Sequence, residues 1–231
     1  ADEVIHMQDL ISPEQQEKEF RLTLSKFAHE IRNPLTLIQS GLQMMAASHP
    51  EITGYREWED ITENLEYVKD LLKETADYSH AGQIFPEKTD LSCLLKSIIL
   101  SFRPSLEYLG IALETDISEQ LPPLYLDCIK IRQAFLNLLR NAQEAICHSH
   151  GVIHISARSV PEGVRVTVSD NGCGMTEEQQ KTIFQPFVTY KQGGTGLGLS
   201  VTRQIIEGHG GKITVHSVPD QGTVFQILFC G

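Results

Sequence analysis

A long series of apolar residues at three- and four-residue steps constrains the first part of the chain more than any other feature. This spacing matches the 3.6-residue turn of an α-helix and traces one apolar stripe along it. Ser12 and Pro13 suit an N-cap and a first helical position, so the pattern predicts a helix from there to about Ala47. The stripe consists of Phe20, Leu24, Phe27, Ile31, Leu35, Ile38, Leu42 and Met45.

A second apolar pattern follows at heptad spacing, which indicates a second helix and therefore a helical hairpin. Two helices alone cannot cover both stripes, whereas two hairpins paired as a four-helix bundle can. The sequence therefore predicts a homodimer through this region. The second pattern consists of Trp58, Ile61, Leu65, Val68, Leu72 and Thr75.

His29 lies off the apolar stripe of the first helix. It is two residues from both Phe27 and Ile31, which places it about 200° around the helix from each. An imidazole on the solvent side is not a packed core histidine, and it is therefore a candidate nucleophile. Pro34 falls within an irregular four-residue step before Leu35, and its missing N–H favours a bend close to His29.

The net charge of −11 argues against nucleic acid or an anionic membrane as the main partner, because such surfaces need concentrated Lys and Arg. The five cysteines form no CxxC pair, which is typical of reduced thiols in the cytoplasm. No window resembles a membrane span or a secretory signal. The expected location is cytoplasmic, and the absence of an initial Met leaves open a longer, membrane-bound sensor protein.

A break at Gly82 and Pro86 marks a linker over residues 81–88, so we expect a hairpin domain at 1–82 and a second domain at 83–231. The order of elements in the second domain predicts an α+β, two-layer sandwich with helices on one face of a mixed sheet. Expected helices cover 91–108, 127–147 with Asp127 as N-cap, and 197–208. Expected strands cover 111–117, 152–160, 164–170, 212–217 and 223–229.

Three polar or glycine-rich clusters in the second domain suit a nucleotide pocket, although each has another explanation when taken alone. Asn137 and Asn141 share a helix face and suit Mg²⁺, or form an ordinary polar face. Asp170, which opens the segment 170–175, is placed to accept a hydrogen bond from an exocyclic amine, or to start a turn. Residues 193–199 are placed to offer N–H groups to phosphates at a helix start, or to form a hinge, and they are not a P-loop.

Taken together, these segments resemble the catalytic core of bacterial sensor histidine kinases, a dimerisation and phosphoacceptor hairpin followed by a Bergerat-type (GHKL) ATP-binding domain. The resemblance runs from about residue 20 to the end. Asn141-Ala-Gln-Glu-Ala and a short lid are most similar to the sporulation and nitrogen-regulation subgroup. The matching boxes are His29–Leu35, Asn137–Ala142, Asp170–Gly174, Phe184–Phe187, Gly194–Leu199 and Gly222–Phe225.

The resemblance implies that ATP and Mg²⁺ bind between the long helix and a lid of about residues 175–195. Asp170 would recognise adenine with support from Thr223, and Asn141 would hold Mg²⁺ with Asn137 beside the phosphates. Further nucleotide contacts are expected at Arg140, Gly172, Gly174, Lys191, Thr195, Gly196, Leu197 and Gly198.

Two departures from the family pattern concern basic and hydroxyl residues. Gln143-Glu144-Ala145 stands where many relatives carry a basic residue, and Arg140 and Lys191 are both candidates for its part. Lys191 also fits a solvated loop lysine. Tyr190 stands where a small hydroxyl residue is frequent.

For the hairpin, the resemblance implies that His29 attacks the γ-phosphorus of ATP in line, with Glu30 orienting its ring. Asn33, one turn further on, would orient a water against a phosphorylated aspartate. The expected function is autophosphorylation of His29 and transfer to an aspartate of a response regulator receiver domain, with phosphatase activity left open. A protein inhibitor of the hairpin is also left open. The alternatives are a GHKL-type ATPase or serine protein kinase, and a non-catalytic scaffold.

Overall fold

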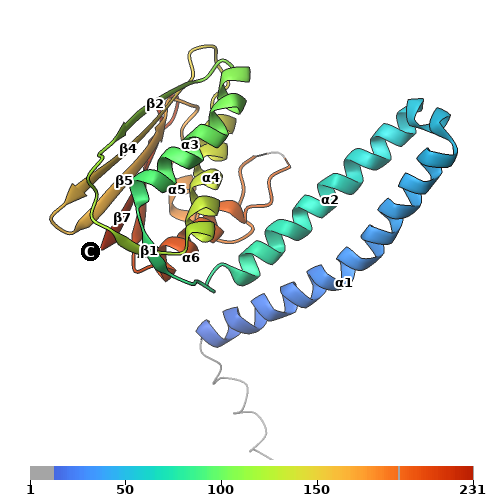
Figure 1. Cartoon of the computed structure of the whole chain (residues 1–231), viewed down its shortest axis with the longest axis horizontal. Coiled ribbons are helices and arrows are strands. Elements are labelled where there is room, and N and C mark those ends of the chain that lie inside the picture. Colours follow the sequence, from blue (N-terminus) through green and yellow to red (C-terminus); the bar gives the residue numbers. More distant parts are fainter. Residues whose placement is uncertain (1–12, 192, 231) are drawn as a thin grey trace, which may run out of the picture. The chain divides into compact units, whose positions relative to one another are not determined.

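The computed structural model describes residues 13–191 and 193–230, so the predicted N-cap Ser12 lies outside the described residues. The chain divides between His80 and Ala81 into two compact units. Figure 1 colours the first unit blue to teal and the second green to red. Each unit has its own buried apolar residues.

The first unit is the predicted helical hairpin. Helix α1 (Pro13–Ser48) and helix α2 (Arg56–His80) pack along each other and are joined by the 3₁₀ turn η1 (Pro50–Gly54). Helix α1 continues through Pro34. Because proline has no N–H, the carbonyl of Glu30 lacks its usual intrahelical donor there, one residue after His29.

A single hairpin covers only part of the apolar stripe. On α2, Leu65, Leu72 and Tyr78 are buried, as is Ala28 on α1. The stripe positions that remain between 46% and 59% exposed are Phe20, Phe27, Ile38 and Met45. These side chains leave an apolar surface on the hairpin that the single chain does not cover.

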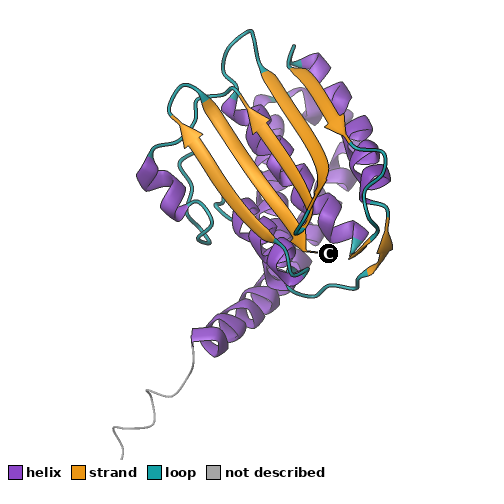
Figure 2. Cartoon of the chain, turned by 90° about the vertical axis from the view of Figure 1, so that its left-hand side faces the viewer, coloured by secondary structure: helices purple, strands orange, loops and turns teal. Residues whose placement is uncertain are grey.

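The second unit is the predicted two-layer sandwich. A five-stranded sheet with the order β2-β4-β5-β7-β6 is covered on one face by helices, and Figure 2 shows its other face without a covering layer. Only β2 and β4 pair in parallel, and the other pairs are antiparallel. The strands are β2 (Ala112–Ile117), β4 (Val152–Val160), β5 (Gly163–Asp170), β6 (Lys212–Val218) and β7 (Gly222–Cys230). The helices are α3 (Leu91–Tyr108), α4 (Cys128–Ala145) and α6 (Gly198–Gly208).

Three short elements of the second unit were not predicted. Strands β1 (Glu87–Thr89) and β3 (Leu124–Leu126) form a separate two-stranded sheet, so the predicted linker 81–88 is wrong over its last two residues. Strands of three residues are too short to show an alternating pattern. Helix α5 (Glu177–Thr182) lies in the expected lid, and its capping box between Thr176 and Gln179 is a signal that the sequence does contain.

Asp127 is the N-cap of α4, as predicted. Its Oδ1 accepts hydrogen bonds from the N–H groups of Ile129 and Lys130, both at 3.1 Å, and its Oδ2 accepts from the N–H of Phe85 at 3.0 Å. Burial opposes ionisation, but these three N–H donors outweigh it and lower the pKa of Asp127. His209 at the end of α6 accepts from the N–H of Asp127 at 2.9 Å. One residue thus joins α4, α6 and the chain that follows the hairpin.

Two expectations from composition can be compared with the described residues. None of the helices among them combines the length and apolar character needed to cross a lipid bilayer. The five cysteines are all free thiols, namely Cys93, Cys128, Cys147, Cys173 and Cys230.

The packing of α4 predicts a stability difference between two residues of that helix. Phe135 is 1% exposed and Ile129 is 80% exposed. Phe135→Ala should lower the free energy of unfolding of the second unit by about 3–5 kcal/mol, because it leaves a cavity in the core. Ile129→Ala should change it by less than about 0.5 kcal/mol.

Urea titrations followed by circular dichroism measure this difference. Trp58, the only tryptophan, lies on α2 and its fluorescence reports on the hairpin separately. Equal urea midpoints for the two variants would contradict the position of α4 in the core.

Candidate functional site

The hairpin presents the predicted phosphoacceptor residues to solvent. His29, Glu30 and Asn33 are all exposed on α1, while Ala28 beside them is buried. His29 and Asn33 are one helical turn apart and so share a face. The structure therefore brings these three residues together on an accessible stretch of helix.

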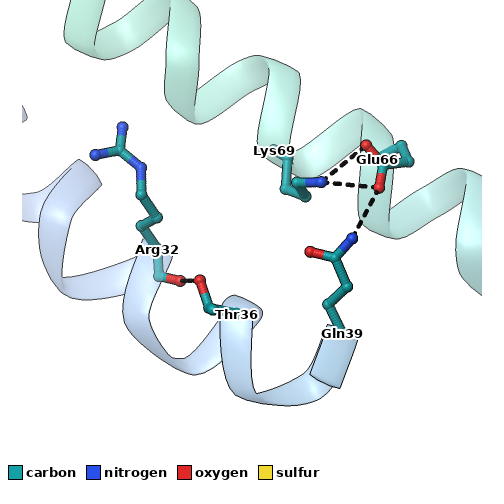
Figure 3. Close-up of polar contacts among 5 residues, drawn as sticks. All are labelled: Arg32, Thr36, Gln39, Glu66 and Lys69. Carbon is teal, nitrogen blue, oxygen red and sulfur yellow. Dashed lines mark hydrogen bonds and ion pairs between the residues drawn. The ribbon is translucent and has the colours of Figure 1, made fainter. Parts of the chain in front are cut away.

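A groove of about 370 Å³ lies between α1 and α2 close to this stretch. Figure 3 shows Glu66 of α2, which accepts hydrogen bonds from Lys69 Nζ at 2.8 Å and from Gln39 Nε2 of α1 at 3.4 Å. Sequence reasoning missed these contacts, because Gln39 and Glu66 are 27 residues apart. The groove is lined by Arg32, Leu35, Thr36, Glu66, Lys69, Asp70, Leu72 and Lys73.

Asp170 in the second unit is a fixed hydrogen-bond acceptor at the last position of β5. Its Oδ1 accepts from the N–H of Gly172 at 2.9 Å, and Thr223 is its partner across the β5–β7 ladder. Burial raises the pKa of the Asp170 carboxyl, and the N–H groups of Gly172 and Thr223 oppose that rise only in part. Because the carboxyl is partly desolvated, a hydrogen bond that it accepts there is stronger than the same bond in water.

The glycines around Asp170 are required by close backbone contacts. A Cβ on Gly172 would lie 2.5 Å from the carbonyl oxygen of Ala145, and one on Gly174 would lie 2.0 Å from that of Val218. Gly174 also has a φ of +64°, which favours glycine. The loop is therefore held tightly against α4 and the end of β6.

Both asparagines of α4 take part in contacts with later segments. Asn137 Nδ2 donates to the carbonyl oxygen of Gly198 at 3.2 Å. Lys191 Nζ lies 2.8 Å from Asn141 Oδ1 and 2.6 Å from Glu144 Oε2. Of the two basic candidates, Lys191 is thus the one in contact with Asn141, whereas Arg140 is exposed on α4.

Glu144 was not among the predicted site residues. The sequence marked its segment only as the place of a missing basic residue, and its partner Lys191 is 47 residues away. In this structure an ammonium group rests between two oxygen atoms, one from Asn141 and one from Glu144. Oxygen ligands are those that Mg²⁺ prefers, so the residues present fit this ion. The described residues include no cluster of three or more His, Cys, Asp or Glu that could hold a metal by themselves.

The glycine-rich segment before α6 is held by internal hydrogen bonds. Thr195 Oγ1 accepts from the N–H of Leu197 at 3.2 Å, and the Leu197 side chain is only 2% exposed. Gly196 has a φ of +72°, and its carbonyl oxygen accepts from the N–H of Phe187 at 3.1 Å. Leu197 therefore anchors this segment in the core, and Gly198 begins α6 beside Asn137.

Known proteins are similar to this chain in sequence and in fold. Residues 126–230 match the family model described as "Histidine kinase-, DNA gyrase B-, and HSP90-like ATPase". The crystallised catalytic domain of histidine kinase ThkA is 33% identical with a TM-score of 0.58, over 63% of this chain and 95% of that one. The chain belongs to the sensor histidine kinases. Its second unit is an ATP-binding domain of the GHKL type.

Longer relatives extend the similarity of this sensor histidine kinase to the hairpin. Sporulation kinase B of Bacillus subtilis (strain 168) is 32% identical over 87% of the chain, in agreement with the expected subgroup. The chain spans 47% of the length of that relative. The structure of ThkA in complex with response regulator protein TrrA is 28% identical over 94% of this chain and 65% of that one, with a TM-score of 0.65.

Burial of Asp170 predicts how a substitution there changes stability with pH. Because its folded pKa lies above the ordinary 3.8, the carboxyl contributes stability that is fully present below that pH and is lost as pH rises through the folded pKa. In Asp170→Asn the side-chain amide does not titrate, so this loss of stability with rising pH is absent. The free energy of unfolding of the variant, relative to the unchanged chain, should therefore rise as the pH increases from 3.8 through the folded pKa.

Asp116 on β2 is the matched control, because the Arg158 guanidinium beside it lowers the pKa of its carboxyl. Its stabilising contribution is present above pH 3.8 and lost as pH falls through the folded pKa. In urea unfolding, the free energy of Asp116→Asn relative to the unchanged chain should therefore fall as the pH rises toward 3.8 and stay constant above it. The same trend for both variants would contradict the desolvation of Asp170.

Proposed function

We propose that this chain is an ATP-dependent protein-histidine kinase of a two-component system. In this proposal His29 receives the γ-phosphoryl group of ATP and passes it to an aspartate of a response regulator receiver domain. The observation that carries the proposal is the occurrence, in one chain, of an exposed His29 on a helical hairpin and an ATP-binding domain. Residues 1–82 serve as the dimerisation and phosphotransfer hairpin, and residues 83–231 as the catalytic domain.

The nucleotide is held by groups that already have fixed positions in the second unit. Asp170 accepts a hydrogen bond from the exocyclic amine of adenine, with support from Thr223. Asn141 is the ligand for Mg²⁺, which when bound neutralises charge on the triphosphate. Phosphate oxygens are received by Lys191 and by N–H groups at Gly196 and Gly198, where α6 begins.

His29 acts as the nucleophile. One ring nitrogen attacks the γ-phosphorus, the bond to the β–γ bridging oxygen breaks, and ADP leaves with the electron pair of that bond. Glu30 accepts the N–H of the other ring nitrogen, which fixes the tautomer and strengthens the attacking nitrogen. Asn33, on the same face, orients a water for hydrolysis of the phosphorylated regulator.

Two macromolecular partners fit the hairpin. The apolar side chains that a single hairpin leaves exposed are those a second copy covers in a four-helix bundle, so the chain is a homodimer. The receiver domain is the second partner, and the solved complex of ThkA with TrrA supports this choice. The five free thiols favour a cytoplasmic location for this chain.

A GHKL-type ATPase or a serine protein kinase shares this kind of pocket, but neither accounts for an exposed histidine on the hairpin. The similarity to Sporulation kinase B also covers 87% of the chain, well beyond the ATP-binding domain. Histidine phosphorylation is therefore the function that the site supports best.

Incubation with γ-labelled ATP tests the proposal. The unchanged chain should take up an acid-labile, alkali-stable label, and His29→Gln should reduce the label to background because the nucleophile is gone. His49→Gln is the control, since His49 is a second exposed histidine of the hairpin. This variant should keep the label.

The type of label separates the alternatives. Label that persists in His29→Gln would refute phosphorylation at this residue. An acid-stable label would indicate a serine kinase, and ATP hydrolysis without any label would indicate a GHKL-type ATPase.

The homodimer is tested with two neighbouring residues of α1. Ile38 belongs to the apolar stripe and is 52% exposed, whereas Leu37 lies off the stripe and is 74% exposed. Ile38→Glu should weaken the dimer at least about tenfold, because it buries an unpaired charge in an apolar interface. Leu37→Glu should leave the dimer intact. Sedimentation equilibrium measures both, and an unchanged dimer in Ile38→Glu would contradict the proposed interface.

A further inference from the structure

Ser217 is a buried hydroxyl residue at the end of β6, next to the strand pair that holds Asp170. It is 6% exposed, and Thr223, its partner across the β6–β7 ladder, is 4% exposed. Thr223 is at the same time the partner of Asp170 across the β5–β7 ladder. The three side chains therefore form one row across the sheet, on the face that the helices cover.

The Ser217 hydroxyl has three polar neighbours. It accepts from the N–H of Met175 at 2.8 Å, donates to the carbonyl oxygen of Gly222 at 2.8 Å, and lies 2.9 Å from Thr223 Oγ1. A serine hydroxyl has a single proton and two acceptor positions. With that proton given to Gly222, the contact with Thr223 is a hydrogen bond only if Thr223 donates.

This arrangement fixes the hydrogen-bonding character of Thr223. Its proton points to Ser217, so its oxygen can only accept from a group or water on the nucleotide side. Asp170 beside it is a carboxyl that accepts from the N–H groups of Gly172 and Thr223. The base therefore meets two acceptors, which suits the amine of adenine and disfavours a ring carbonyl at the same position.

We propose that Ser217 is a positioning residue that determines the base preference of the nucleotide site by holding Thr223 as an acceptor. The inference deepens the proposed function and rests on the binding of an adenine nucleotide at Asp170. The competing ligand that it excludes is a 6-oxopurine nucleotide. An inosine nucleotide is the sharpest probe, because it differs from an adenine nucleotide only by the carbonyl and ring N–H that replace the amine and bare ring nitrogen.

Gln180 on α5 allows the role of the hydroxyl to be separated from the position of the strand. Its side-chain amide pairs with both backbone groups of Ser217, accepting from the N–H at 3.0 Å and donating to the carbonyl oxygen at 2.9 Å. It makes no use of the Ser217 hydroxyl. Its Nε2 also donates to the carbonyl oxygen of Met175 at 3.2 Å. Gln180→Leu therefore loosens the end of β6 and its contact with Met175, but it keeps both the Ser217 and the Thr223 hydroxyl.

Calorimetric titration of the full chain with ADP and with IDP tests the proposal without phosphoryl transfer. The unchanged chain should bind ADP more tightly than IDP. Ser217→Ala should reduce the ratio of the two affinities about tenfold, because the Thr223 proton is released and can donate to the carbonyl of IDP. Ser217→Thr retains a hydroxyl and should restore most of the ratio.

Gln180→Leu should lower the affinity for both diphosphates together and leave their ratio unchanged. An unchanged ratio in Ser217→Ala, or an equal loss of ratio in Gln180→Leu, would overturn the role of the Ser217 hydroxyl while leaving the proposed kinase function intact. No ADP binding by the unchanged chain would overturn the proposed function and the role of Ser217 together.

Discussion

The close approach of three backbone segments at the end of β5 is the constraint on which the nucleotide site depends. A Cβ on Gly222 would lie 1.9 Å from the carbonyl oxygen of Asp170, and Cβ atoms on Gly174 and Gly172 would lie 2.0 Å and 2.5 Å from other carbonyl oxygens. Because no side chain separates these segments, Asp170 is held at one place against the N–H of Gly172. Burial raises the pKa of Asp170 at this place, and the hydroxyls of Thr223 and Ser217 continue the row beside it.

The sequence predicted those parts of the fold that rest on long periodic patterns. The stripe of α1 and the alternation of β4 and β5 extend over enough residues to identify the element type, and Asp127 was recognisable as an N-cap. The strands β1 and β3 carry only three residues each, and their pairing joins segments that are far apart in the sequence. Such pairing has no local signal.

The candidate site divides in the same way. His29, Asn141 and Asp170 stand in motifs whose order identifies the family, so they could be named from the sequence. Glu144 and Ser217 could not, because their partners Lys191 and Gln180 lie 47 and 37 residues away. Their contacts exist only once α4 has met the segment with Lys191, and β6 has met α5.

The Asp127 junction has a mechanical consequence. The hairpin leads into the second unit through the chain around Phe85, whose N–H is bonded to the carboxylate that caps α4. A pull on that chain is therefore borne first by the cap of α4 and, through His209, by the last turn of α6. The same α4 carries Asn137 and Asn141 in its later turns. The chain that leads out of the hairpin is thus tied by a hydrogen bond to the cap of the helix that carries Asn137 and Asn141, the residues proposed to lie beside the phosphates.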